Sequence, residues 1–151
     1  MNQKPLPPIP TEEARLVSVG GPIDRVKVAL RLFGDSLDPD EVTTLLQCTP
    51  STARKKGDVI PDKRYHRVAS TGSWLLDGDP ESGGDIERQI ADLLNRMTTD
   101  LDIWVSLTER FKVDIFCGLF LDDCNRGFDL SPDIIRALSD RHITVGFDIY
   151  A

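Results

Sequence analysis

The sequence predicts an α+β fold of the ferredoxin-like, split β-α-β type, in which helices cover one face of a mainly antiparallel sheet. Three observations support this prediction. Apolar and polar residues alternate, as in half-buried strands, at residues 24–33, 112–121 and 142–150. Apolar stripes at helical spacing lie between these strands. The segments that begin at residues 24 and 112 also share one pattern, a strand followed by a helix with proline at its first position. Because crossovers are right-handed, we expect both helices on the same face.

The N-terminal segment is expected to differ from the remainder of the chain. Four of the ten prolines fall within the first ten residues, and proline fixes φ and removes an amide donor. We therefore predict a flexible leader at residues 1–13 and a single domain at residues 14–151, with a short edge strand at 15–19. The prolines also leave open a polyproline ligand for another protein.

The first unit starts with the strand at residues 24–33, in which Val26, Val28, Leu30 and Leu32 share one face. A helix follows, for which Asp38 is a suitable N-cap and Pro39 suits the first position. Pro50 ends this helix. Residues 51–62 are polar and rich in turn-forming residues, and residues 66–76 are predicted to form the next strand.

A pair of helices is predicted between the two units, as an insertion at residues 85–111. Asp85 caps the first helix and Asp100 caps the second. The apolar stripe of the first has the spacing i, i+4, i+7, i+8 and i+11, at Ile86, Ile90, Leu93, Leu94 and Met97.

The second unit repeats the arrangement of the first. A strand at residues 112–121 precedes a turn, a brief strand at 128–130, and a helix that Ser131 caps and Pro132 begins. The last strand covers residues 142–150. Each predicted strand of this unit therefore presents one apolar and one mixed face.

The charge balance and the cysteines limit the classes of protein to consider. The formal net charge of −7 argues against general binding to nucleic acid. No apolar run approaches the length of a membrane span, and the N-terminus lacks the apolar stretch of a signal peptide. Three cysteines without a CxxC spacing suit a cytosolic protein. We therefore expect a cytoplasmic location and no contact with a membrane.

Short motifs for catalysis are absent, including GxSxG, HExxH, GxxxxGK[ST] and GxGxxG. His66 and His142 are interpreted as surface histidines. Carboxylates cluster after the first strand, but helix capping explains most of them, and only Asp35 has no such explanation. The basic run that begins at Arg54 is interpreted as a solvated loop. We assign no catalytic residue, no metal ligand and no cofactor.

Several short segments together resemble a known family. They are Leu32–Asp35 (LFGD), Leu37–Val42 (LDPDEV), Arg54–Asp58 (RKKGD), Gly72–Trp74 (GSW), Leu130–Pro132 (LSP) and Asp148–Tyr150 (DIY). Their order and spacing resemble the bacterial domain-of-unknown-function family numbered 4279, over about residues 24–150. The resemblance implies a small, usually single-domain bacterial protein with no assigned catalytic residues.

The second face of the sheet is the candidate binding site, because it combines glycine, aromatic residues and both signs of charge. The candidate binding residues are Arg31, Asp35, Arg54, Phe116, Phe120, Asp148 and Tyr150. We expect this face to be covered by the N-terminal segment or a loop, a second subunit, or a partner. The alternative is an exposed face on which Arg31 pairs with Asp114 or Asp148 and the aromatic residues cover one another.

Two functional hypotheses follow. The first is a non-catalytic protein-interaction module, which binds a protein partner through the sheet face or an acidic surface and whose possible roles include immunity-type inhibition of a basic toxin. The second is a small-ligand-binding protein or enzyme, with a site between the sheet face and the loops near Asp35, Arg54 and Asp79. Self-association with two sheets face to face is a third arrangement.

Overall fold

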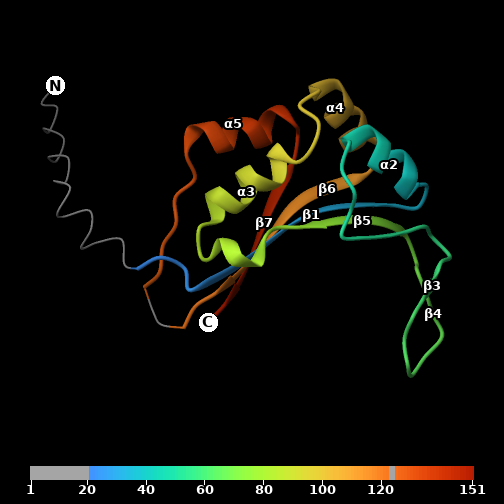
Figure 1. Cartoon of the computed structure of the whole chain (residues 1–151), viewed down its shortest axis with the longest axis horizontal. Coiled ribbons are helices and arrows are strands. Elements are labelled where there is room, and N and C mark those ends of the chain that lie inside the picture. The colour runs from blue at the N-terminus through green and yellow to red at the C-terminus, as the bar shows by residue number, and fades with distance from the viewer. Residues whose placement is uncertain (1–20, 123–124) are drawn as a thin grey trace, which may run out of the picture.

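Four α-helices lie on one face of a five-stranded sheet in this computed structural model, which describes residues 21–122 and 125–151 (Figure 1). The sheet has the strand order β2-β5-β1-β6-β7, and a two-stranded hairpin of β3 and β4 stands apart from it. In chain order the elements are β1 (Arg25–Gly34), α2 (Pro39–Leu46), β2 (Thr52–Arg54), β3 (Val59–Ile60), β4 (Arg67–Val68), β5 (Gly72–Asp77), α3 (Ile86–Asn95), α4 (Leu101–Arg110), β6 (Lys112–Phe120), α5 (Pro132–Asp140) and β7 (Thr144–Tyr150).

The predicted α+β class and the mainly antiparallel sheet are confirmed. β1 pairs antiparallel with both β5 and β6, and β2 pairs antiparallel with β5. β6 and β7 are parallel and are connected through α5. The ferredoxin-like detail is not confirmed, because a split β-α-β unit has another strand between its two strands, whereas β6 and β7 are direct neighbours. Two helices, α3 and α4, form within residues 85–111, on the same side of the sheet as α2 and α5 (Figure 1), and their predicted role as an insertion between two units is not confirmed.

The predicted helix starts are confirmed. Asp38, Asp85, Asp100 and Ser131 each accept a hydrogen bond from a backbone amide two or three residues further along the chain. These caps satisfy amides that have no partner within the helix. Proline occupies the first turn of α2 and of α5, where its missing amide costs nothing. Local sequence chemistry therefore fixes where each helix begins.

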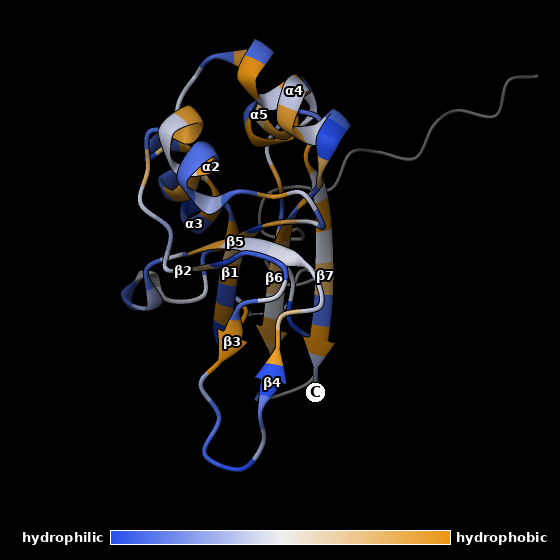
Figure 2. Cartoon of the chain, turned by 90° about the vertical axis from the view of Figure 1, so that its right-hand side faces the viewer, coloured by the Kyte–Doolittle hydropathy of each residue, from blue (hydrophilic) through white to orange (hydrophobic). Residues whose placement is uncertain are grey.

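The core lies between the helices and the sheet. Side chains at alternate positions of β1, β5 and β6 point toward the helices, and several of them are completely buried. The buried members on these strands include Leu30, Leu32, Trp74, Leu76, Ile115 and Leu119. Figure 2 shows apolar segments on the helices and strands that enclose this core, whereas the tip of the β3–β4 hairpin is hydrophilic.

The strand predicted at residues 66–76 is wrong as a continuous element, because it divides into β4 and β5. β4 pairs with β3, and the amide of Ala69 donates to the carbonyl oxygen of Asp58 at 2.8 Å. β5 begins at Gly72, where an added Cβ would lie 2.6 Å from the carbonyl oxygen of Gly34. Only glycine allows this close approach of β5 to the end of β1.

Other local predictions differ from the structure. The polar stretch at residues 51–62 contains β2 and β3, and no strand forms at residues 128–130. The proposed leader at residues 1–13, the start of the domain at residue 14, the predicted strand at 15–19 and Cys124 all lie outside the described residues. Within residues 21–122 and 125–151, no helix has the length and apolar character needed to cross a bilayer.

Candidate functional site

The face of the sheet opposite the helices is uncovered by the described part of the chain (Figure 1). Strand register places the predicted mixture of residue types on this open face. Its residues on the three strands β1, β6 and β7 include Arg25, Lys27, Ala29, Arg31, Asp114, Phe116, Gly118, Phe120, Gly146, Asp148 and Tyr150. The candidate residues Arg31, Phe116, Phe120, Asp148 and Tyr150 are therefore brought onto one surface.

An ion pair fixes the middle of the open face. Arg31 Nε donates to Asp114 Oδ1 and Arg31 Nη2 donates to Asp114 Oδ2, both at 2.8 Å. This two-point contact holds the guanidinium in one orientation, and the hydrogen bond raises the pKa of Arg31. The Asp114 side chain is only 10% exposed, so water screens the pair weakly. The same guanidinium lies over the Phe116 ring, 4.5 Å from its centroid.

A stack of rings and a guanidinium occupies one end of the open face. The rings of Phe120 and Tyr150 are nearly parallel, with centroids 4.9 Å apart. The Arg25 guanidinium lies 4.2 Å from the centroid of Phe120. The Tyr150 hydroxyl donates to Asp148 Oδ2 at 2.5 Å, and this bond raises the pKa of Tyr150. The contacts on this surface therefore match the alternative stated above, in which Arg31 pairs with Asp114 and the aromatic rings cover one another.

The structure separates the other two candidate residues from this group. Arg54 lies on β2, opposite Ser73, near the end of β1 that is distant from Phe120. Asp35 lies beyond the end of β1 and is exposed. Its carboxylate accepts a hydrogen bond from Lys56 Nζ at 2.8 Å, which lowers the pKa of Asp35. Asp35 is therefore explained by pairing with the basic loop.

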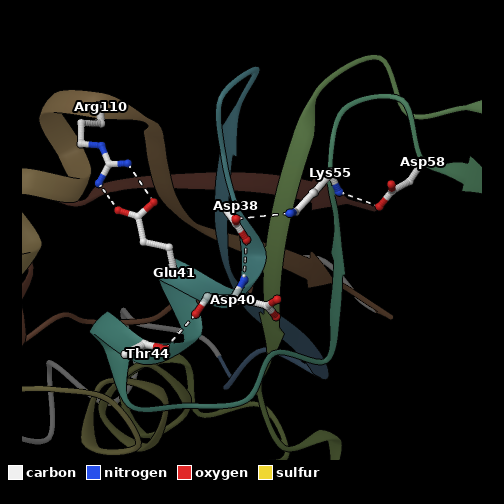
Figure 3. A network of polar contacts seen from close by, with 7 residues as sticks. All are labelled: Asp38, Asp40, Glu41, Thr44, Lys55, Asp58 and Arg110. Carbon is white, nitrogen blue, oxygen red and sulfur yellow. Dashed lines mark hydrogen bonds and ion pairs between the residues drawn. The ribbon is translucent and has the colours of Figure 1, made fainter.

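The acidic cluster after β1 and the basic run after β2 hold each other in place. Figure 3 shows Asp38 between the amide of Asp40 and the ammonium of Lys55, at 3.0 Å and 3.2 Å. The amide of Lys55 in turn donates to Asp58 Oδ2 at 2.8 Å. The hydrogen bond from the Asp40 amide and the contact with the Lys55 ammonium lower the pKa of Asp38. The charged groups that seemed available for a ligand therefore position the start of α2 against the loop after β2.

Two cations on the open face are not among the candidate binding residues that the sequence predicts, although alternation along the strand places Lys27 on this face. Arg25 and Lys27 lie on the same side of β1 as Arg31, and neither forms an ion pair with a described residue. The alternation of β1 contains this signal, because Arg25, Lys27 and Arg31 are all at odd positions. The sequence does not show that Arg31 pairs with Asp114 whereas Arg25 and Lys27 have no carboxylate partner among the described residues, because this difference depends on the fold.

The described titratable groups offer little for nucleophilic or metal chemistry. No group of three or more histidine, cysteine, aspartate or glutamate side chains within residues 21–122 and 125–151 is arranged to hold a metal ion. Cys117 is buried on β6, and burial raises the pKa of its thiol to about 12. The thiolate needed for nucleophilic attack is therefore scarce at neutral pH.

We expect Cys117 to resist alkylation in the folded protein. Iodoacetamide at pH 8 should label Cys48, which is half-buried, and should label Cys117 only after guanidinium unfolds the chain. Mass spectrometry of the peptides would measure both rates. Equal labelling of Cys117 and Cys48 in the absence of guanidinium would contradict a closed core at β6.

Comparison with known proteins identifies one family. The family described as a domain of unknown function, DUF4279, matches residues 24–151. No curated protein and no solved structure matches the chain. The match includes every strand and helix described above and agrees with the resemblance carried by the short sequence segments. The chain therefore belongs to the DUF4279 family.

Proposed function

We propose that this chain is a non-catalytic protein-interaction module that binds an acidic segment of a protein partner on the uncovered side of its sheet. The observation that carries the proposal is the separation of charge between the two sides of the fold. Cations that pair with no carboxylate of the described residues lie on the uncovered side, although the chain as a whole is acidic.

The uncovered side has two sources of positive charge. Arg25 and Lys27 extend from β1 and form no ion pair with a described residue. The β3–β4 hairpin projects on the same side, away from the helices (Figure 1). Residues 59–68, which form this hairpin, contain three basic residues and one acidic residue. An acidic segment that lies along the sheet would therefore meet cations at the strands and at the hairpin.

The helical side has the opposite charge. Residues 78–111, which include α3 and α4, contain eight acidic and three basic residues. Such a charge distribution orients an acidic partner toward the sheet during diffusional encounter and repels it from the helices. This effect favours one docking orientation and raises the rate of association.

The aromatic contacts argue against single-stranded nucleic acid as the partner. Binding of bases to an open sheet requires free ring faces for stacking. Arg25 lies against Phe120, whose ring also stacks on Tyr150, and Arg31 lies over Phe116. The Phe120 ring therefore orders Arg25 for contact with carboxylates of a partner, whereas Arg31 is already paired with Asp114.

A basic partner is a second candidate, because the acidic surface of α3 and α4 suits one. The immunity-type role, in which the chain would inhibit a basic toxin, depends on this surface. Charge complementarity would place such a toxin against the helices and leave the open sheet face free. The two candidates thus predict different docking sides and different partner charges.

A random-peptide phage library tests the proposal without knowledge of the natural partner. We expect selection on the wild-type protein to enrich peptides rich in aspartate and glutamate. The double variant Arg25→Glu/Lys27→Glu should lose these peptides, because it reverses the charge of the open face. A matched control, Asp92→Lys/Asp102→Lys, changes the helical side and should keep them.

Two other outcomes of the selection, and one outcome of a separate light-scattering measurement, would count against the proposal. Enrichment of basic peptides, lost in the Asp92→Lys/Asp102→Lys control, would support the toxin-binding candidate. Retention of acidic peptides by the double variant of the sheet would place their site elsewhere. Light scattering that gives twice the 16.8 kDa mass would identify self-association as the use of the face.

A further inference from the structure

A notch opens beside β1, where the neighbouring strand ends early. β5 pairs with β1 only as far as Asp77, opposite Ala29. β1 continues to Arg25, so its first four residues have β6 on one side and, among the described residues, no strand on the other. The chain leaves the sheet at Gly78, and a cavity of about 580 Å³ remains at this place. Small-molecule sites have volumes of this size, from roughly 300 to 1,000 Å³.

Two carbonyl oxygens on the exposed strand edge inside the notch already accept hydrogen bonds. The amide of Gly78 donates to the carbonyl oxygen of Val28 at 2.7 Å. The side chain of Gln89, which is buried, donates to the carbonyl oxygens of Val26 at 3.2 Å and Gly83 at 2.8 Å. These bonds remove the acceptors that would attract an added strand. The notch therefore favours a small molecule, because an extended peptide strand would have to displace Gly78 and Gln89 from these acceptors in order to pair with β1.

The walls of the notch combine apolar surface with positive charge. The apolar residues that line the cavity are Val26, Val28, Ala29, Leu75, Pro80 and Phe116. Cations from β1 also line it, and a single carboxylate does so, at Asp77. The guanidinium of Arg31 is already bound to Asp114, which leaves Arg25 and Lys27 to contact a ligand.

We propose that this notch binds a small organic anion, a carboxylate with an apolar body. The apolar body packs between Ala29, Leu75 and Phe116, where it loses contact with water. The carboxylate lies toward Lys27 and Arg25, because Asp77 repels it from the opposite wall. This site shares Arg25 and Lys27 with the surface proposed for an acidic protein segment, and it differs from that surface because its ligand also fills the cavity.

Two naphthalene dyes of similar shape test the proposal. 8-Anilinonaphthalene-1-sulfonate carries an anionic group, which stands in for the carboxylate, and N-phenyl-1-naphthylamine has no charge. We expect the anionic dye to bind the folded wild-type protein with a rise in fluorescence and to bind more tightly than the neutral dye. Lys27→Gln should weaken its binding by about tenfold, because the variant loses a charge-assisted contact.

Matched variants separate the charge of the notch from its volume. Lys112→Gln removes a cation from the open face outside the notch and should leave the affinity for both dyes unchanged. Ala29→Leu narrows the cavity and should weaken the binding of both dyes. Thermal unfolding of each variant excludes dye binding by a partly unfolded chain.

Three results would overturn the site. They are equal affinity of the wild type for the two dyes, equal affinity of wild type and Lys27→Gln for the anionic dye, and an equal effect of Lys112→Gln and Lys27→Gln. The phage selection can fail while the dye experiment succeeds, and the reverse, since the peptide does not require the cavity. The two proposals are therefore separately testable.

Discussion

Replacement of Trp74 by alanine should lower the free energy of unfolding by about 3–5 kcal/mol, the usual cost of removing a large buried ring. Trp74 lies on β5, is completely buried, and faces α2. Its indole Nε1–H donates to Thr43 Oγ1 at 3.1 Å. The substitution removes the packing between the sheet and α2 and leaves a cavity. Since domains are typically stable by only about 5–15 kcal/mol, this loss is a large fraction of the total.

Urea unfolding followed by circular dichroism would measure the effect, and two variants would divide it. Trp74→Phe keeps most of the ring and loses the N–H donor, and Thr43→Ala removes only the acceptor. Each should cost less than Trp74→Ala, with about 1 kcal/mol for the hydrogen bond. If Trp74→Phe lowers the free energy of unfolding as much as Trp74→Ala does, then the buried volume of the ring is not the main contribution of Trp74 to stability.

The second large effect is expected at the ion pair of the open face. Asp114→Ala should lower the free energy of unfolding by about 2–3 kcal/mol, because it removes both hydrogen bonds and leaves the Arg31 guanidinium without its counter-charge. The Arg31 side chain is 29% exposed, so water recovers part of the loss. We therefore expect a smaller loss in the free energy of unfolding than the roughly 5 kcal/mol at the upper end for fully buried ion pairs.

A double-mutant cycle measures this interaction directly. Arg31→Met and Asp114→Ala, separately and together, should show a coupling energy of about 1–3 kcal/mol. The double variant should be less destabilised than the sum of the single variants, since neither charge is then left alone. Additive effects would show that the two side chains contribute independently. The exposed pair Arg136 and Asp133 provides a control with little expected coupling.

Local chemistry in the sequence predicted the helices and the longest strands well. N-caps such as Asp85 and Ser131 mark helix starts, and the period of two in residues 24–33 marks β1. Strand order is a different matter, because it depends on contacts between segments distant in the chain. The ferredoxin-like order followed from the repeated units, and nothing local signals that β6 and β7 are direct neighbours. The two-residue strands of the β3–β4 hairpin are too short to show a period.

The candidate site was predictable to the same extent as the strands that form it. Alternation placed Arg31, Phe116 and Tyr150 on one face of the sheet, because side chains two residues apart share a side. The pairing of Arg31 with Asp114, 83 residues away, requires the register between β1 and β6. The contact of Asp35 with Lys56 likewise depends on the fold of a loop. The notch beside β1 results from the length of β5 and has no signal of its own in the sequence.

The central strand pair also affects how the chain folds during synthesis. β1 can pair with β5 soon after the first half of the chain emerges, but its other edge waits for β6, which is made much later. Until then the apolar stripe of β1 remains partly open. Its pairing with β6 joins positions such as Arg31 and Asp114, which are 83 residues apart, and non-local strand pairing of this kind is slow. Association of β6 with β1 closes the second edge of β1, and the core is complete only after Ile134 and Leu138 of α5 have also packed. We expect the nascent chain to be most vulnerable to aggregation before these steps.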